Sequence, residues 1–258
     1  SEIKAPIVVI SATIPPAVLR AIGSELRLEF DLFRCRTERP NHRYALHQDV
    51  PRDRSFTLIK QILLDARREK DFAPWYVFAM TVKDLTEIVQ YLGKTTLRVA
   101  IYHGRLDRSE KLRVDSQWME GGLDVLVCTG AYGAGNDKGV TGGCICHGPS
   151  YTCNSLSQWF GRAGRDGRVV QCILISVIGS QSQKDVAMQR LTGGGRCLRG
   201  IIHNEVDGMW GGSCLEHPQF QNCSVCDKSV EIMVSMGKML HDVCYNGQWC
   251  RVLWLNSL

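Results

Sequence analysis

The sequence lacks several features that would assign it to common protein classes. It has no apolar run long enough to cross a membrane, and its first residues lack the layout of a signal peptide. No Asp-Glu-x-His box for magnesium is present. Gly93-Lys94-Thr95 imitates the end of a phosphate-binding loop, but Ile88 stands where that loop requires a glycine. The missing membrane span and signal peptide lead us to expect an intracellular protein with no membrane partner.

The composition is that of a globular protein with a mild basic balance. Its 258 residues, 44% of them hydrophobic, suit one large domain or two modest ones. The formal net charge of +5 favours polyanionic partners only weakly. The presence of 12 cysteines without a secretory signal indicates reduced thiols and leaves room for a bound metal.

Predicted strands and helices alternate along most of the chain, which indicates an α/β fold with a parallel sheet covered by helices on both faces. A second, smaller module is expected from near Ser180, because Gly193-Gly194-Gly195 marks a break after which the alternation stops. Strands are predicted at residues 5–10, 75–80, 97–102, 124–129, 143–147 and 169–178. Helices are predicted from Pro15 onward and at 55–70, 81–92, 107–120 and 155–161, with a weak helical patch at 233–240.

Two groups of cysteines have spacings that could bind a metal. Four thiolates in the loop-rich second module would suit tetrahedral Zn²⁺, with a pair of disulfides as the rival interpretation. This first group consists of Cys197, Cys214, Cys223 and Cys226. The alternative group is Cys144, Cys146, His147 and Cys153, although free cysteines often behave as small buried apolar residues.

Two arginines dominate the segment Gln-Trp-Phe-Gly-Arg-Ala-Gly-Arg-Asp-Gly at residues 158–167. On a helix or a helix-ending turn, their spacing places Arg162 and Arg165 on one face, and the small residues around them let another surface approach. Permanently charged guanidinium groups suit a transferring γ-phosphoryl group. A solvated basic turn would explain the bare pair. The complete string, however, resembles motif VI of superfamily-two helicases in the form carried by the RecQ family of DNA helicases.

Other segments extend this resemblance over roughly residues 5–227. Ser11-Ala12-Thr13 is similar to motif III, and Arg-Pro-Asn-His-Arg-Tyr at 39–44 is similar to the segment that connects the two RecQ lobes. Residues 102–106 resemble the Tyr-His-x-Gly-Leu segment, and residues 127–138 resemble motif V. Ala134 and Asn136 depart from motif V, where the family has Met and then Ile or Val. The first cysteine group resembles the RecQ zinc-binding subdomain, with a longer gap between its second and third ligands.

Neighbouring helicase families fit less well. Ski-two-like helicases also carry Gly-Arg-Ala-Gly-Arg, but they lack this cysteine cluster and show His-His-Ala-Gly where this chain has Tyr102-His103-Gly104. DEAD-box proteins have His-Arg in place of Gly161-Arg162. The RecQ resemblance implies a division into a first-lobe remnant at 1–48, a RecA-like second lobe at 49–179, a zinc-binding subdomain at 180–227 and an unassigned tail at 228–258.

The resemblance also implies roles for individual residues. ATP with Mg²⁺ would lie between this lobe and a missing first helicase lobe, with Arg165 as the arginine finger and Arg162 and Gln158 beside it. Gly135 and Asp137 would help to bind the nucleotide. Single-stranded or partly duplex DNA would be held through its phosphates. The residues expected to contact DNA are Thr81, His103, Gly104, Arg105 and Thr129.

Two functions of different class follow from these expectations. In the first, the chain is the C-terminal part of an ATP-dependent 3′-to-5′ DNA helicase and is inactive alone, because it lacks the P-loop and the magnesium box. In the second, it is a truncated or decayed relative that binds nucleic acid or a protein through its zinc module.

Overall fold

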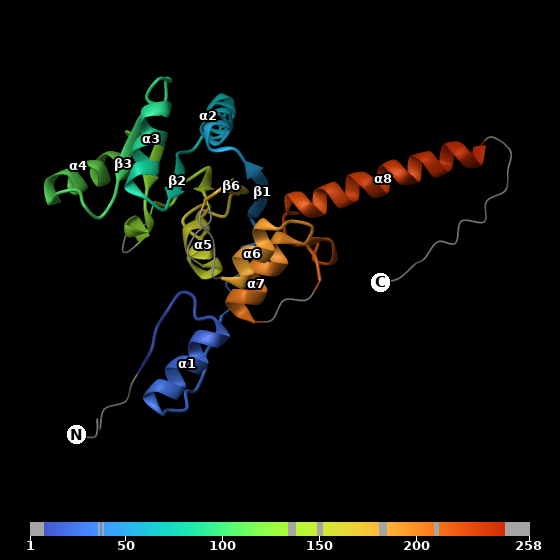
Figure 1. The fold of residues 1–258 in the computed structure, drawn as a ribbon, viewed down its shortest axis with the longest axis horizontal. Coiled ribbons are helices and arrows are strands. Elements are labelled where there is room, and N and C mark those ends of the chain that lie inside the picture. The colour runs from blue at the N-terminus through green and yellow to red at the C-terminus, as the bar shows by residue number, and fades with distance from the viewer. Residues whose placement is uncertain are drawn as a thin grey trace.

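A computed structural model describes residues 8–35, 37, 39–133, 138–148, 152–180, 185–208 and 212–245 (Figure 1). Its centre is a six-stranded sheet in the order β1-β6-β5-β2-β4-β3, and every neighbouring pair is parallel. This confirms the predicted parallel α/β fold. The strands are β1 (His42–Val50), β2 (Trp75–Ala79), β3 (Val99–Tyr102), β4 (Val125–Cys128), β5 (Gly143–His147) and β6 (Val170–Val177).

Helices pack on both faces of this sheet, as predicted. The helices are α1 (Pro16–Leu26), α2 (Arg52–Arg68), α3 (Val82–Leu92), α4 (Arg108–Met119), α5 (Cys153–Phe160), α6 (Val186–Thr192), α7 (Leu198–Asp207) and α8 (Ser224–Tyr245). One core lies between the sheet and helices α2 and α3, where Ile59 and Ile88 join the strand residue Ile145. The other core lies beneath α4, α5, α6 and α7 and includes Trp118 and Phe160.

Helix α3 shows how local signals position an element. Its buried side chains, Leu85, Ile88 and Leu92, lie at the spacing of one helical face, which is why α3 covers the sheet. The helix begins after Thr81, whose side chain accepts a hydrogen bond from the backbone N–H of Asp84. Asp107 caps α4 in the same way, through the N–H of Glu110. Both helix starts agree with the prediction.

Two parts of the sheet differ from the prediction. The expected strand at 5–10 is wrong over the part that the structure describes, because residues 8–10 are irregular and Ile10 is 89% exposed. Strand β1 was not predicted, although it pairs with β6 from His42 to Val50. Its polar and apolar residues do not alternate cleanly, so a period-two pattern was missing. We propose that the sheet-containing unit begins at His42 rather than at residue 49.

The segment predicted as the second module, residues 180–227, contains α6, α7, a short 3-10 helix (Cys214–Glu216) and the start of α8. Helix α8 extends away from the rest of the structure (Figure 1), and its exposed apolar residues include Ile232 and Met233. It contains the predicted helical patch at 233–240 but begins at Ser224, before the expected tail. Among the described residues, no helix is both long and apolar enough to cross a membrane.

Candidate functional site

The two motif VI arginines lie in consecutive turns directly after α5. That helix ends at Phe160, and the backbone N–H of Arg162 then donates to the carbonyl of Trp159 at 3.1 Å. Arg162 is half-buried, whereas Arg165 is exposed and its Nε donates to the carbonyl of Gly161 at 3.4 Å. The pair therefore occupies a helix-ending turn, one of the two local structures that the spacing indicated.

A cavity of about 710 Å³ brings motif VI together with motif III. Gln158, Arg162 and Arg165 line it together with Ser11 and Thr13. Nε2 of Gln158 donates a hydrogen bond to Oγ1 of Thr13 at 2.8 Å. Residues far apart in the sequence thus form one polar wall. The predicted nucleotide-binding residues Gly135 and Asp137 lie outside the described residues.

The connector at residues 39–44 holds the arginine loop, residues 161–168, in place, a role that the sequence did not indicate. Nδ2 of Asn41 donates to the carbonyls of Gly164 and Arg168, both at 2.8 Å. Nε2 of His42 lies 3.1 Å from the carbonyl of Ala163 and is its donor. Burial lowers the pKa of His42 to about 4, so this side chain is neutral near pH 7.

Gly164 is required for this close approach. Its φ of +64° lies in the left-handed region, and an added Cβ would come within 2.7 Å of Asn41 Nδ2 and of Val170 Cγ2. The loop is also held by the residue two positions before β5, because Oγ1 of Thr141 accepts from the N–H of Gly164 at 3.2 Å. The backbone that carries both arginines is therefore fixed from several directions.

The residues expected to contact DNA gather at the carboxyl edge of the sheet. Thr81 follows β2, His103 follows β3, and Thr129 follows β4. These strands are parallel neighbours, so their carboxyl ends share one edge. The N–H of Thr129 donates to the carbonyl of Tyr102 at 3.2 Å, which places the turns after β4 and β3 side by side.

The turn after β3 presents backbone and cationic groups. Nδ1 of His103 accepts a hydrogen bond from the N–H of Arg105 at 3.2 Å, and the Arg105 side chain is exposed. Nζ of Lys111 donates to the carbonyl of Gly104 at 2.7 Å. An exposed guanidinium beside a helix start is suited to a phosphate oxygen. The arginine loop precedes β6, so it lies at the opposite, amino edge of the sheet.

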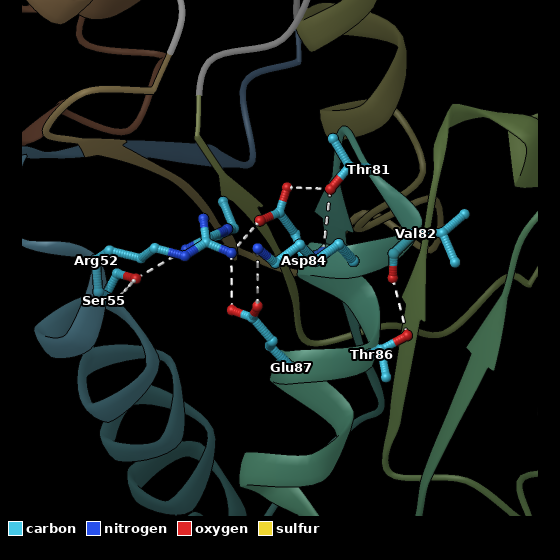
Figure 2. A network of polar contacts seen from close by, with 9 residues as sticks. Arg52, Ser55, Thr81, Val82, Asp84, Thr86 and Glu87 are labelled. Carbon is cyan, nitrogen blue, oxygen red and sulfur yellow. Dashed lines mark hydrogen bonds and ion pairs between the residues drawn. The ribbon is translucent and has the colours of Figure 1, made fainter.

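The hydroxyl of Thr81 is already engaged within its own helix cap (Figure 2). It accepts from the N–H of Asp84 at 3.1 Å and donates to Oδ2 of Asp84 at 2.6 Å. Nη2 of Arg52 bridges Asp84 Oδ1 and Glu87 Oε2 at 2.6 and 2.8 Å. Burial raises the pKa of Asp84, but hydrogen bonds from Thr81 and Arg52 outweigh it and lower that pKa. A phosphate here would have to compete with this carboxylate.

The first cysteine group converges to a compact cluster. The sulfur atoms of Cys197, Cys214, Cys223 and Cys226 all lie within 4.8 Å of one another. Cys197 Sγ is 3.4 Å from Cys214 Sγ and 3.9 Å from Cys223 Sγ. Ligands about 2.3 Å from a tetrahedral Zn²⁺ are separated by about 3.8 Å. The donor set and its spacing therefore fit Zn²⁺, and all four cysteines are free rather than disulfide-bonded.

Hydrogen bonding within the cluster favours a thiolate. Hydrogen bonds from the Cys197 and Cys214 thiols lower the pKa of Cys223. Burial raises the pKa of Cys226 to about 12, and the neighbouring negative charge of Cys223 adds to that rise. A cation at the centre would remove this conflict between like charges.

The alternative cysteine group does not converge. Cys144 and Cys146 face the core beneath α5. His147 instead points to the other face of the sheet, where its Nε2 lies 2.8 Å from Ser55 Oγ and its ring stacks on Phe56. Within the described ranges, the first cysteine group is the one set of three or more clustered metal-ligating side chains. The alternative interpretation is therefore wrong, because adjacent strand residues face opposite ways.

Comparison with known proteins shows which proteins this chain is similar to. The sequence model of the protein family described as helicase conserved C-terminal domain matches residues 55–167 of this chain. ATP-dependent DNA helicase Q1 of Mus musculus is 27% identical over 212 residues, covering 77% of this chain and 32% of the relative. The probable ATP-dependent DNA helicase RecS of Bacillus subtilis is 27% identical over 186 residues, covering 71% and 36%. The chain therefore resembles the C-terminal portion of RecQ-type helicases.

The chain spans about a third of the length of those relatives. Among solved structures, S. cerevisiae Dbp5 L327V bound to Gle1 H337R and IP6 has a TM-score of 0.55 at 16% identity, covering 88% of this chain and 52% of that one. Dbp5 L327V bound to RNA and ADP BeF3 has a TM-score of 0.54 at 17% identity, covering 71% and 52%. These likenesses show the RecA-like helicase fold and nothing finer.

Proposed function

We propose that this chain is the C-terminal part of an ATP-dependent 3′-to-5′ DNA helicase of RecQ type. The observation that carries the proposal is the shared cavity that Gln158, Arg162 and Arg165 line together with Ser11 and Thr13. Arg165 acts as the arginine finger. Its guanidinium donates to phosphoryl oxygens as negative charge develops on them.

The remaining residues of the cavity orient the finger. Arg162 is half-buried and provides a second positive charge, while Gln158 connects α5 to Thr13. ATP with Mg²⁺ supplies the phosphoryl group when it is bound between this lobe and a first helicase lobe. Gly135 and Asp137 complete the nucleotide contacts on this side. The chain alone hydrolyses no ATP, because it has no P-loop.

DNA binds along the carboxyl edge of the sheet. Arg105, the backbone after His103, and Thr129 contact phosphates of single-stranded or partly duplex DNA, which positions the strand without reading its bases. Thr81 contributes through the start of α3, because its hydroxyl is used by the cap. Zn²⁺ on the four cysteines has a structural role, since sulfur fills every position. The intracellular location, nuclear in a eukaryote, follows from this function.

ATP turnover tests the proposal. We expect no DNA-stimulated turnover from the chain alone and recovery of turnover when the first lobe of a RecQ relative is joined to it. Arg165→Ala should then lower turnover by about 10³-fold or more, the usual scale for an arginine finger. Arg168→Ala is the matched control, because Arg168 pairs with Asp166 at 2.6 Å. Equal losses in both variants would contradict the assignment of Arg165.

The second candidate function is that of a non-enzymatic binding module. Its support is the compact cysteine cluster, which needs no nucleotide. This candidate would be favoured if the fusion of this chain with the first lobe of a RecQ relative binds DNA and zinc but does not hydrolyse ATP.

A further inference from the structure

Arg199 is a charged side chain that is completely buried. It lies on α7, two residues after Cys197, and is 0% exposed. Its guanidinium contacts the rings of Tyr44 and Phe220, at 4.8 and 4.7 Å from their centroids. Two aromatic faces stabilise a cation in a site that water does not reach.

The guanidinium nitrogens of Arg199 are directed at backbone carbonyls. Nη1 donates to the carbonyl of Arg39 at 3.0 Å, and Nη2 donates to the carbonyls of His42 and Gln221 at 2.5 and 3.2 Å. Arg39 begins the connector and His42 is the first residue of β1, whereas Gln221 belongs to the cysteine-containing loop. The side chain of Arg199 therefore joins the second module, which contains the four cysteines, to the connector.

The same connector residues hold the arginine loop. The side chains of Asn41 and His42 bind the carbonyls of Gly164, Arg168 and Ala163. A continuous series of contacts thus runs from α7 through residues 39–42 to residues 163–168. It ends on the backbone that carries Arg165.

Burial makes this connection hard to distort. A buried cation that loses its carbonyl acceptors keeps its desolvation cost, so a shift of the connector is strongly disfavoured. Nε of Arg199 already lacks a partner within the described structure. The remaining donors and the two rings must therefore satisfy the charge together.

We propose that Arg199 is a positioning residue that fixes the arginine loop through the connector. An ordered arginine loop therefore requires that the second module is intact. The consequence for catalysis rests on the proposed role of Arg165. The mechanical link does not, because it concerns contacts of this chain alone.

Amide hydrogen exchange on the 258-residue chain tests the link. Arg199→Lys keeps the charge but loses the planar fork that reaches several carbonyls. We expect exchange at the amides of Ala163, Gly164 and Gly167 to rise by about tenfold or more, the effect of losing a charge-assisted hydrogen bond. The amide of Ile145 in the central strand β5 should stay protected, and the zinc content should stay unchanged.

Arg43→Ala is the matched control. Arg43 also joins β1 to the second module, through Asp227 Oδ2 at 2.7 Å, but this surface pair is separate from the connector carbonyls that Arg199 binds. The substitution should leave exchange in the arginine loop unchanged. Faster loop exchange in both variants, or no change in a folded Arg199→Lys protein, would overturn the proposal.

If the Arg199→Lys variant does not fold, native-state amide hydrogen exchange of the unmodified chain tests the link instead. In the unmodified chain at low denaturant, the amides of the arginine loop should open together with those of Ile202 and Val206 on α7. Opening of the loop at clearly lower denaturant than α7 would refute the link. Neither measurement requires ATP turnover, so a failure here is distinct from a failure of the proposed function.

Discussion

Oγ1 of Thr13 accepts a hydrogen bond from Nε2 of Gln158 at 2.8 Å, across 145 positions of the sequence. This contact joins the segment before α1 to the last turn of α5. Helix α1 has no buried residue, and the segment before it is also held by Arg34, whose Nη2 donates to the carbonyl of Ile14 at 2.5 Å. Removing one hydrogen bond should change its mobility measurably.

Gln158→Ala should loosen residues 8–26 without unfolding the sheet. A hydrogen bond of this kind contributes about 1 kcal/mol, so cleavage within this segment by a protease should become roughly fivefold faster. Ser157→Ala is the control, because Ser157 lines the same cavity but does not bind Thr13. Equal cleavage rates for Gln158→Ala and the unmodified chain would show that the contact has no role in holding the segment.

The cap of α3 should contribute to stability. Thr81→Val removes the hydroxyl that serves both the backbone and the side chain of Asp84, and we expect the free energy of unfolding to fall by about 1 kcal/mol. Thr86→Val is a matched control on the same helix, since Thr86 Oγ1 bonds back to the Val82 carbonyl at 2.9 Å (Figure 2). Urea denaturation measures both. A similar effect of the two substitutions would argue against a special role for the cap.

Binding to single-stranded DNA should be weak, salt-dependent and indifferent to sequence. One lobe offers few phosphate contacts, so a dissociation constant on the order of micromolar or weaker is expected. Arg105→Ala should weaken binding and flatten the salt dependence. Arg68→Ala, at the far end of α2, should not, because Arg68 pairs with Asp65. Fluorescence anisotropy at several salt concentrations tests this, and affinity that does not change with salt would contradict it.

Purified protein should contain about one zinc ion per chain. Loss of the metal should unfold the second module, because such sites supply on the order of 10 kcal/mol of folding free energy. Elemental analysis should show a lower zinc content in Cys226→Ser but not in Cys144→Ser. Well under one zinc per chain, with all four cysteines reduced, would rule out the metal site.

His147 should make stability depend on pH below neutrality. Burial lowers its pKa from 6.5 to about 4, so the unfolded chain binds a proton between these values and the folded chain does not. The free energy of unfolding should therefore fall as the pH falls from about 6.5 to about 4, by up to about 3 kcal/mol from this group. His147→Gln should lose less stability over that range. Parallel pH profiles for the two proteins would disprove this role of His147.

Strands β2 to β6 and the helices between them could be predicted from the sequence because their signals are local. Strands β2, β4 and β5 are short apolar runs, and buried strands of a parallel sheet need such runs. Caps at Thr81 and Asp107 mark helix starts through contacts within a few residues. The string at residues 158–167 also carries the family resemblance, since its glycines and arginines are close together in the sequence.

The tertiary structure alone decided which distant residues meet. Strand β1 lacks a clear local pattern and is fixed by pairing with β6. Cys144 and His147 are close in sequence yet face opposite sides of the sheet, whereas Cys197 and Cys226 are brought together from separate elements. The burial of Arg199 depends on rings and carbonyls from separate segments. Local periodicity sets each element, but packing between elements fixes such contacts.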